Sequence, residues 1–393
     1  MGSTASPGPP GPWADFLRSE RGRLERLGLR RSVVTPERRA GVRAYLGGRE
    51  FILFTSNDYL GLAAHPEVIA AAGEAARRFG TGAGSARLLH GSTPLHEDLQ
   101  ERLARLTGKQ SSLLFSSGYM ANLGLLSALA GNGDAIFYDE RAHASIIDGA
   151  RLSRATALSY PHNDAGRLDD LLRKTHARRR MVVTESVFSM DGDLAPLEAL
   201  GETASRHDAL LVVDEAHAIA VFGEGGGLLG RFGPDAPAVV TGTLSKGLGS
   251  VGGFVAGDPA LIEFLIDRSR TFIFDTALPP SAVAAAAAAL DVARNEPWRR
   301  KRVLDLGETL RSSLSRLGYA PSRSDSQIVP VLLGRPAAAV AAEEHLEAHG
   351  ILARAVRPPA VPRGTSRIRF GVTAAHEEEH LRQVAAAMES FRG

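Results

Sequence analysis

Short apolar segments alternate with amphipathic segments through the middle of the chain, from about residue 111 to residue 257. Seven of the apolar segments have the length of strands and are nearly continuous, which is typical of a parallel sheet buried on both faces. The segments between them have the pattern of helices that cover such a sheet. We therefore predict an α/β fold with a seven-stranded, mostly parallel sheet between helices, its strands lying at 113–115, 135–138, 156–160, 181–184, 210–213, 239–243 and 253–256.

The flanking regions follow other patterns. Residues 13–28 predict a basic amphipathic helix, and residues 51–54 predict a strand. A helix should begin at Ser92 or Thr93, because a proline and two acidic residues follow these capping hydroxyls. After about residue 285 an alanine-rich helix is followed by mixed helices and strands, which predicts a smaller α+β domain. We expect a disordered tail, an N-terminal helix and arm, a large domain and a small C-terminal domain, at 1–12, 13–50, 51–285 and 286–393.

Composition excludes several classes of protein. The 393 residues include no cysteine, which excludes disulfides, thiolate metal sites and a thiol nucleophile, and a reduced cytoplasmic location is expected. A formal net charge of +2 gives no nucleic-acid footprint. No stretch approaches the roughly 20 apolar residues that cross a membrane. The 42 glycines indicate many tight turns and close approaches to the backbone.

Two motif matches carry little weight. Residues 247–252 fit G-x-G-x-x-G, but a strand rather than a helix is predicted after them, which argues against a dinucleotide site. Residues 376–380 fit the H-E-x-x-H pattern of zinc proteases. Three acidic and two histidine side chains on an amphipathic helix, with no third ligand evident, are interpreted as a solvated face. No metal is therefore expected.

Asp214 and Lys246 each follow a predicted strand, so both are expected at the edge of the sheet where ligands bind. Asp214 and Glu215 could alternatively hold magnesium in a nucleotide hydrolase, but the sequence has no matching phosphate loop. A lysine in a partly desolvated site has a lowered pKa and can form a Schiff base. Pyridoxal phosphate needs such a lysine together with an acid for its ring nitrogen. The pattern therefore indicates a pyridoxal-phosphate enzyme.

Nine ordered segments resemble the α-oxoamine synthases, a family of fold-type I pyridoxal-phosphate enzymes, from about residue 20 to the end of the chain. The resemblance implies the fold of that family, a large cofactor-binding domain with a smaller C-terminal one. The matching segments are SNDYLGL (56–62), GTGAGSARLLHGS (80–92), HEDLQERLA (96–104), FSSGYMAN (115–122), HASIIDGARLS (143–153), TESVFSMDGD (184–193), VVDEAH (212–217), TLSKGLGSVGG (243–253) and RPPAVPRGTSRIR (357–369).

The resemblance implies a role for four residues around the reactive centre. Lys246 would hold pyridoxal phosphate as a Schiff base and later move the Cα proton of the substrate. Asp214 would pair with the ring nitrogen, and His217 would contact the ring oxygen. His143 would stack on the ring face and border the substrate.

Further positions match the family's contacts to the cofactor. Backbone N–H groups at the start of a helix suit a phosphate, and hydroxyls surround the ring in the family. Thr276 matches a residue that reaches the phosphate of the partner subunit, which implies a homodimer with shared sites. The positions are Gly118, Tyr119, Ser189, Thr243, Ser245 and Thr276.

Substrate contacts are implied at five positions. Arg369 is the first choice for the substrate carboxylate and Arg357 the second, since a guanidinium binds a carboxylate through two parallel hydrogen bonds. Asn57 matches a supporting position, and Arg30 or its neighbour Arg31 matches an N-terminal substrate arginine. Ala360 stands at the substrate mouth where a threonine is common.

Within the family, the chain is most similar to the branch that makes the biotin precursor 8-amino-7-oxononanoate. That branch joins L-alanine to a pimeloyl thioester, carried on coenzyme A or on acyl carrier protein, with loss of carbon dioxide. A sister synthase that uses glycine or serine with another acyl thioester, or one from a natural-product pathway, is the alternative. Ala218 and Ala220 depart from the family, which commonly has glycines there.

Overall fold

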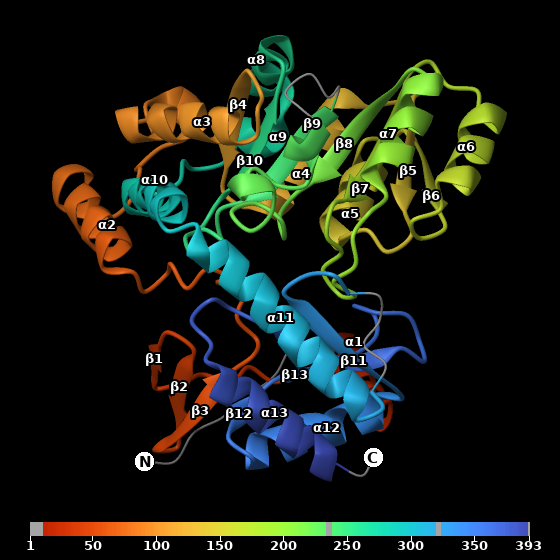
Figure 1. Cartoon of the computed structure of the whole chain (residues 1–393). Coiled ribbons are helices and arrows are strands. Elements are labelled where there is room, and N and C mark those ends of the chain that lie inside the picture. The colour runs from red at the N-terminus through yellow and green to blue at the C-terminus, as the bar shows by residue number, and fades with distance from the viewer. Residues whose placement is uncertain (1–10, 233–237, 320–323, 392–393) are drawn as a thin grey trace.

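The computed structural model describes residues 11–232, 238–319 and 324–391. Figure 1 shows one half of the molecule built around a large sheet and a second half that contains both ends of the described chain, with helix α11 running between them. The helices are α1 (Pro12–Arg26), α2 (Pro66–Phe79), α3 (Pro94–Leu106), α4 (Gly118–Leu129), α5 (Ala144–Leu152), α6 (Ala165–Lys174), α7 (Leu197–Arg206), α8 (Pro259–Arg268), α9 (Arg270–Ile273), α10 (Pro280–Asn295), α11 (Trp298–Arg316), α12 (Pro336–Ala348) and α13 (Glu378–Ser390), with short 3₁₀ turns η1 (Arg87–Leu89), η2 (Gly223–Gly225) and η3 (Leu229–Phe232).

The strands form three sheets. The large sheet contains β4 (Ser111–Phe115), β5 (Ala135–Asp139), β6 (Thr156–Tyr160), β7 (Arg180–Glu185), β8 (Ala209–Asp214), β9 (Ala238–Thr243) and β10 (Gly253–Gly257). The two smaller sheets contain β1 (Arg38–Ala40), β2 (Arg43–Leu46), β3 (Arg49–Leu53), β11 (Ile328–Gly334), β12 (Ile351–Leu352), β13 (Arg354–Val356) and β14 (Ser366–Gly371).

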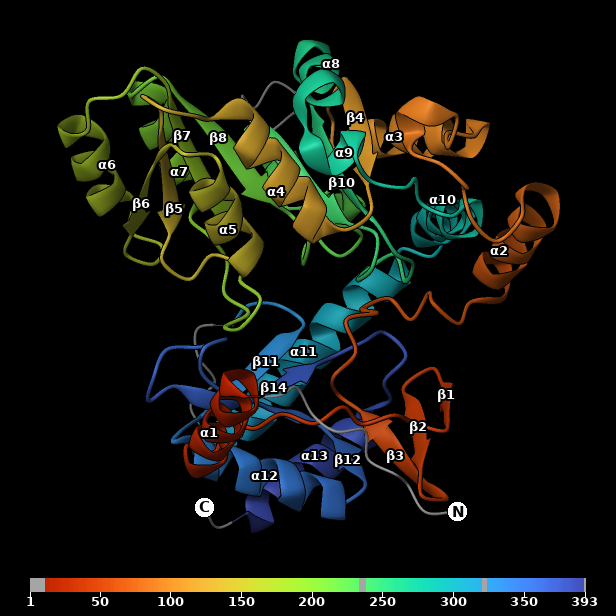
Figure 2. The same cartoon turned by 180° about the vertical axis from the view of Figure 1, so that it is seen from behind.

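The seven predicted strands of the large sheet are all confirmed, in the order β4-β10-β9-β8-β7-β5-β6. Strand β10 runs antiparallel to both β4 and β9, and the remaining neighbours are parallel. Alternate residues face opposite sides, since Val182 packs with one apolar cluster while Met181 and Val183 pack with the other. Helices α4, α5 and α8 supply one cluster and α3, α7 and α10 the other, so helices cover both faces (Figure 2).

The N-terminal arm packs with the C-terminal part of the chain. Strand β3, which follows β1 and β2 in one sheet, pairs in parallel with β12 through Ile52 and Ile351. A second small sheet has the order β11-β14-β13 and is antiparallel throughout. The boundaries that we predict at residues 50 and 285 stay predictions, and nearly all of the predicted tail lies outside the described residues.

Residues 376–380 show where the sequence interpretation needs correction. The solvated-face interpretation is wrong for both histidines, because His376 and His380 are buried. His376 stacks on Phe54 at 4.2 Å and its Nε2 lies 3.0 Å from the carbonyl of Leu53. His380 accepts the N–H of Glu377 and so closes the first turn of α13. These histidines are packing and capping residues.

Candidate active site

The predicted site residues gather at the carboxyl ends of three adjacent strands. Asp214 ends β8 and Thr243 ends β9, with Lys246 three residues further on, and Glu185, which is not among the site residues predicted above, ends the neighbouring strand β7. Strand β10 follows residues 247–252, so the G-x-G-x-x-G match does not lead into a helix. Glycine is required at position 249, because φ is positive there (61°) and a Cβ would lie 2.4 Å from the backbone nitrogen of Ala63. This turn returns the chain to the sheet directly after the lysine.

A buried network holds the carboxylate of Asp214. Its Oδ2 accepts a hydrogen bond of 2.7 Å from Asn122 Nδ2, and its Oδ1 accepts one of 2.9 Å from the N–H of Ala216. Asn122 also donates to Ser145 Oγ at 2.9 Å and accepts from Thr241 Oγ1 at 2.8 Å. Asn122 was not predicted as a site residue, although it ends one of the matched segments; only its position in α4, opposite β8, reveals the contact.

Glu215, the neighbour of Asp214, faces away from this network. Its carboxylate accepts the N–H groups of Leu228 and Leu229 at 3.1 and 2.7 Å. Burial raises the pKa of Glu215 to about 7. Because the two acids hold different partners on opposite sides, they do not form the cation-binding pair of a nucleotide hydrolase.

The ammonium group of Lys246 lies among charged groups without a hydrogen bond to any described residue. Burial lowers the pKa of Lys246, and the positive charge of Arg369 adds to the decrease, whereas Asp214 and Glu185 oppose it. Burial also raises the pKa of Glu185 to about 8, with Asp214 adding to the rise. A lysine with a lowered pKa and no partner is suited to act as a nucleophile or base.

His143 caps helix α5 beside the lysine. Its backbone N–H donates to Glu185 Oε1 at 2.7 Å, and its Nδ1 lies 2.8 Å from Ser145 Oγ. Loss of hydration lowers the pKa of His143, which favours the neutral ring. The ring of Tyr119 lies edge-on to it at 6.0 Å, and the Tyr119 hydroxyl is bonded to Asp148. The histidine ring is thus fixed from both sides.

A second buried group joins His217 to Arg369. The hydroxyl of Tyr59 lies 2.7 Å from His217 Nδ1 and accepts a hydrogen bond of 3.2 Å from Arg369 Nη2. Arg369 also donates to Asn57 Oδ1 at 3.3 Å and, through Nε, to the backbone carbonyl of Ser189 at 2.6 Å. The sequence indicated Tyr59 only as part of the matched segment 56–62. The structure adds it to the candidate site.

The start of helix α4 forms a narrow cup with the end of β9. Ser117 caps the helix by accepting the N–H of Met120, while the N–H groups of Gly118 and Tyr119 have no partner within the helix. A Cβ on Gly118 would lie 3.2 Å from the Cβ of Thr243. Thr243 Oγ1 lies 2.8 Å from Ser245 Oγ, which places two hydroxyls beside the cup. Exposed N–H groups with adjacent hydroxyls can bind a phosphate.

Three predicted substrate residues lie together outside this inner group. Arg30, Arg357 and Ala360 line a cavity of about 610 Å³ between the N-terminal arm, α12 and the segment after β13. Arg30 pairs with Glu25 at 2.7 Å, and Arg357 donates to the backbone carbonyls of Gly28 and Arg30. Arg31 lines the same cavity, so the choice between Arg30 and Arg31 stays open. Of the two predicted carboxylate ligands, Arg369 is the one beside Lys246.

Thr276 is exposed and forms no hydrogen bond or ion pair with the residues described above. It forms an isolated bridge with Ala86, and the next residue, Ala277, donates to the carbonyl of Ser85 at 3.0 Å. Large apolar side chains stand exposed on the same two segments, with Leu89 at 68% and Phe274 at 71%.

In the ranges that the structure describes, no group of His, Asp or Glu side chains is arranged to hold a metal ion. No helix in those ranges is both long enough and apolar enough to cross a membrane.

Comparison with known proteins decides the family. Residues 49–388 match the family model of aminotransferase class I and II. The 8-amino-7-oxononanoate synthase of Anaeromyxobacter dehalogenans (strain 2CP-1) is 48% identical over 376 residues, covering 95% of this chain and 94% of that protein. The chain belongs to the 8-amino-7-oxononanoate synthase family. This confirms the resemblance on which the site residues were predicted.

Two solved structures resemble the 8-amino-7-oxononanoate synthase fold described here. A serine palmitoyltransferase from S. paucimobilis, solved with a bound PLP–myriocin aldimine, has a TM-score of 0.91 and 32% identity over 97% of this chain and 98% of its own. The 8-amino-7-oxononanoate synthase from Francisella tularensis has a TM-score of 0.74 and 27% identity over 86% and 97%. Both confirm the predicted fold class.

Proposed function

We propose that this protein is an acyltransferase that condenses L-alanine with a pimeloyl thioester and releases 8-amino-7-oxononanoate, carbon dioxide and a free thiol, in biotin biosynthesis. One observation carries the proposal. The half-buried side chain of Lys246 makes no hydrogen bond to a described residue, its charge interacts with the charges of Asp214 and Arg369, and the chain is 48% identical to a named 8-amino-7-oxononanoate synthase.

The residues present fit pyridoxal 5′-phosphate. Lys246 would hold the cofactor's aldehyde carbon, and Asp214, fixed by Asn122, would take the ring nitrogen. The cup at Gly118 and Tyr119 would take the phosphate, since a side chain at Gly118 would crowd Thr243. The remaining proposed contacts to the cofactor are His143, Ser189, His217, Thr243, Ser245 and, from the partner subunit's copy, Thr276.

When bound, the cofactor supplies a protonated ring that accepts the electron pair left when the Cα proton of the amino acid departs. Lys246 Nζ, with its lowered pKa, takes that proton and returns one to the product. Arg369 holds the carboxylate of the amino acid, and Asn57 and Tyr59 hold the guanidinium in place. The imidazole of His143, held through Nδ1 by Ser145, would cover the ring face.

The acyl donor would enter through the cavity lined by Arg30, Arg357 and Ala360. Its arginines suit the phosphates of coenzyme A or of a carrier-protein prosthetic group. A homodimer accounts for Thr276 and for the exposed Leu89 and Phe274, because large apolar side chains gathered on one surface indicate a protein interface. We place the enzyme in the cytoplasm.

The alternative is a sister synthase. The serine palmitoyltransferase structure superposes more closely than the 8-amino-7-oxononanoate synthase structure, but sequence identity is higher to the named 8-amino-7-oxononanoate synthases. The test follows thiol release with pimeloyl, acetyl, succinyl and palmitoyl thioesters combined with alanine, glycine or serine. We expect the fastest turnover with L-alanine and the pimeloyl thioester. Fastest turnover with glycine or serine would contradict the proposal.

A further inference from the structure

The loop between β7 and α7, residues 186–196, leaves the large sheet and contacts side chains of strand β14. The loop folds back on itself: Val187 bridges Leu194, Phe188 N–H donates to the carbonyl of Asp193 at 3.0 Å, and Gly192 N–H donates to the carbonyl of Phe188 at 2.8 Å. Ser189, whose carbonyl accepts from Arg369, stands near its tip. The position of the loop therefore affects how Arg369 is held.

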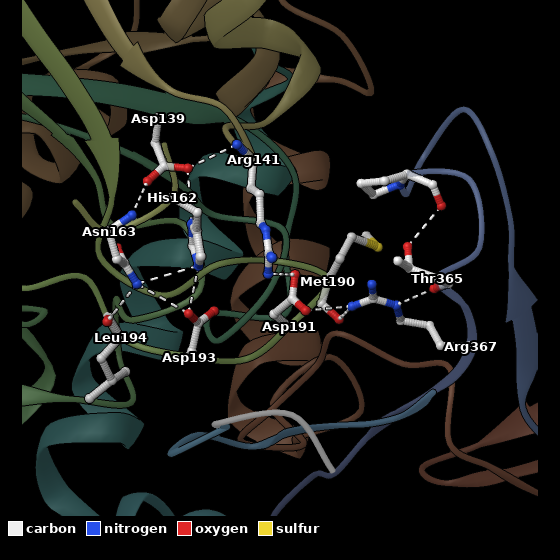
Figure 3. Close-up of polar contacts among 11 residues, drawn as sticks. Asp139, Arg141, His162, Asn163, Met190, Asp191, Asp193, Leu194, Thr365 and Arg367 are labelled. Atoms are coloured by element: carbon white, nitrogen blue, oxygen red, sulfur yellow. Dashed lines mark hydrogen bonds and ion pairs between the residues drawn. The ribbon is translucent and has the colours of Figure 1, made fainter. Parts of the chain in front are cut away.

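His162, in the loop after β6, joins the carboxylate of Asp139 at the end of β5 to that of Asp193 in the β7–α7 loop (Figure 3). Its Nδ1 lies 2.9 Å from Asp139 Oδ1 and its Nε2 lies 2.7 Å from Asp193 Oδ2. A neutral imidazole has one N–H, so only the protonated ring can donate to both carboxylates. The ring also stands edge-on to Phe188 at 4.4 Å, inside the β7–α7 loop.

Asn163 strengthens the same junction. Its backbone N–H donates to Asp139 Oδ2 at 2.8 Å. Its side-chain amide donates to Asp193 Oδ2 at 3.1 Å and to the carbonyl of Leu194 at 3.2 Å. His162 and Asn163 together hold Asp193 and Leu194, near the end of the loop, against the end of β5.

The far side of the loop holds strand β14. Asp191 Oδ1 accepts from Arg367 Nη1 at 2.6 Å, and both side chains are buried. The second oxygen of Asp191 lies 3.3 Å from Arg141 Nη1. Arg367 and Arg369 are two residues apart on β14, so their side chains leave the same face of the strand. The loop therefore holds adjacent arginines, one through Asp191 and one through Ser189.

The charges of this junction balance only when His162 is protonated. Three carboxylates stand against three cations, namely Asp139, Asp191 and Asp193 against Arg141, His162 and Arg367. Asp139 is fully buried, and the side chains of Asp191 and Asp193 are only 8% and 13% exposed. Removal of one cation leaves a buried carboxylate unpaired, which is costly at low exposure.

We propose that His162 is a positioning residue. It holds the β7–α7 loop in place by joining Asp193 in the loop to Asp139 at the end of β5, and thereby orients Arg369 toward the carboxylate of the amino-acid substrate. The inference rests on the proposed function, because Arg369 is the carboxylate ligand only in that reaction. His162 touches neither substrate nor cofactor in this scheme and acts through the loop.

The test compares His162→Gln with a matched control, His207→Gln. His207 also pairs with a carboxylate, Asp169, at 3.0 Å, but at the junction of α6 and α7 away from the loop. We expect His162→Gln to raise KM for L-alanine about tenfold while kcat changes by less than about threefold. Hydrogen–deuterium exchange of residues 186–196 in the cofactor-free protein should increase. The control should change neither measurement.

Asp193→Asn, which keeps the shape of the side chain, gives a second variant if His162→Gln fails to fold, and it should shift KM in the same direction. Unchanged KM and unchanged exchange in the folded variant would overturn the inference. An equal loss of kcat in both histidine variants would overturn it too, since that loss would be general destabilisation. Failure of the proposed function is distinguishable, because the unaltered enzyme would then not use L-alanine, whereas the exchange measurement still decides the role of the loop.

Discussion

The hydroxyl of Tyr59 lies 2.7 Å from Nδ1 of His217 in a fully buried position. The same hydroxyl accepts from Arg369 Nη2 at 3.2 Å and donates to Asn57 Oδ1 at 3.2 Å. The contact between the Tyr59 hydroxyl and Nδ1 sets the orientation of the His217 ring. One tyrosine thereby links the proposed ring-oxygen contact to the proposed carboxylate contact.

We predict that Tyr59→Phe lowers kcat/KM for L-alanine about tenfold, because it removes a buried hydroxyl that contacts both His217 and Arg369, at a cost of about 1–2 kcal/mol. Steady-state kinetics with varied L-alanine checks this. Tyr45→Phe is the matched control, because it removes an exposed hydroxyl on β2 that is bonded to Glu50 on β3, and it should have little effect. Equal effects in the two variants would contradict the role assigned to Tyr59.

Asn122→Leu should weaken cofactor binding. The substitution keeps the volume of the side chain but removes the donor to Asp214 and leaves the hydroxyls of Ser145 and Thr241 without this partner. We expect the dissociation constant for pyridoxal 5′-phosphate to rise at least about tenfold, equivalent to about 1.4 kcal/mol. Titration followed by the absorbance of the bound cofactor measures it. Asn295→Leu, at the exposed end of α10, should leave the affinity unchanged.

Ala220 adopts a left-handed backbone conformation, with φ of 67°, at one of the two positions where the family commonly has glycine. Ala220→Gly and Ala218→Gly both remove one buried methyl group, but only the first relieves a left-handed alanine. We expect Ala218→Gly to destabilise the protein by about 1–2 kcal/mol and Ala220→Gly to be close to neutral. Urea unfolding of both variants measures the two changes in unfolding free energy. Equal losses of stability would show that the backbone of Ala220 is not strained.

His162 should make stability depend on pH. Burial alone would lower its pKa, but hydrogen bonds to Asp139 and Asp193 outweigh that effect and raise the pKa from 6.5 to about 9. The raised pKa favours the protonated folded state, so this stabilisation is complete below pH 6.5 and is lost as the pH rises through 9. Arg141, Asp191 and Arg367 face the same junction.

The measurement is the difference in unfolding free energy between the unaltered protein and His162→Gln. We expect it to be on the order of 3 kcal/mol at pH 6 and to decrease steadily toward pH 10. His207→Gln is again the control. A difference that stays constant with pH would show that the ring is not the titrating group.

The sequence predicted the large sheet well because continuous apolar runs leave few alternatives to buried parallel strands. It also predicted Asp214 and Lys246 at the edge of the sheet where strands end, and both lie at that edge, whereas the role of His143 was implied by the family resemblance and stays a prediction. Asn122 and Tyr59 were missed as site residues because their importance depends on contacts 92 and 158 residues away in the chain. His376 was misread because the pattern of a helix surface says nothing about Phe54 stacked against it.

The pairing of β3 with β12 has a consequence for how the protein is made. Ile52 finds its neighbour Ile351 only after about 300 further residues have left the ribosome. At a synthesis rate of roughly 5–20 residues per second, strand β3 waits tens of seconds with one edge open. The large sheet can assemble meanwhile, since its strands lie between residues 111 and 257. The N-terminal arm is thus translated early and completed late, an interval in which chaperones can recognise it.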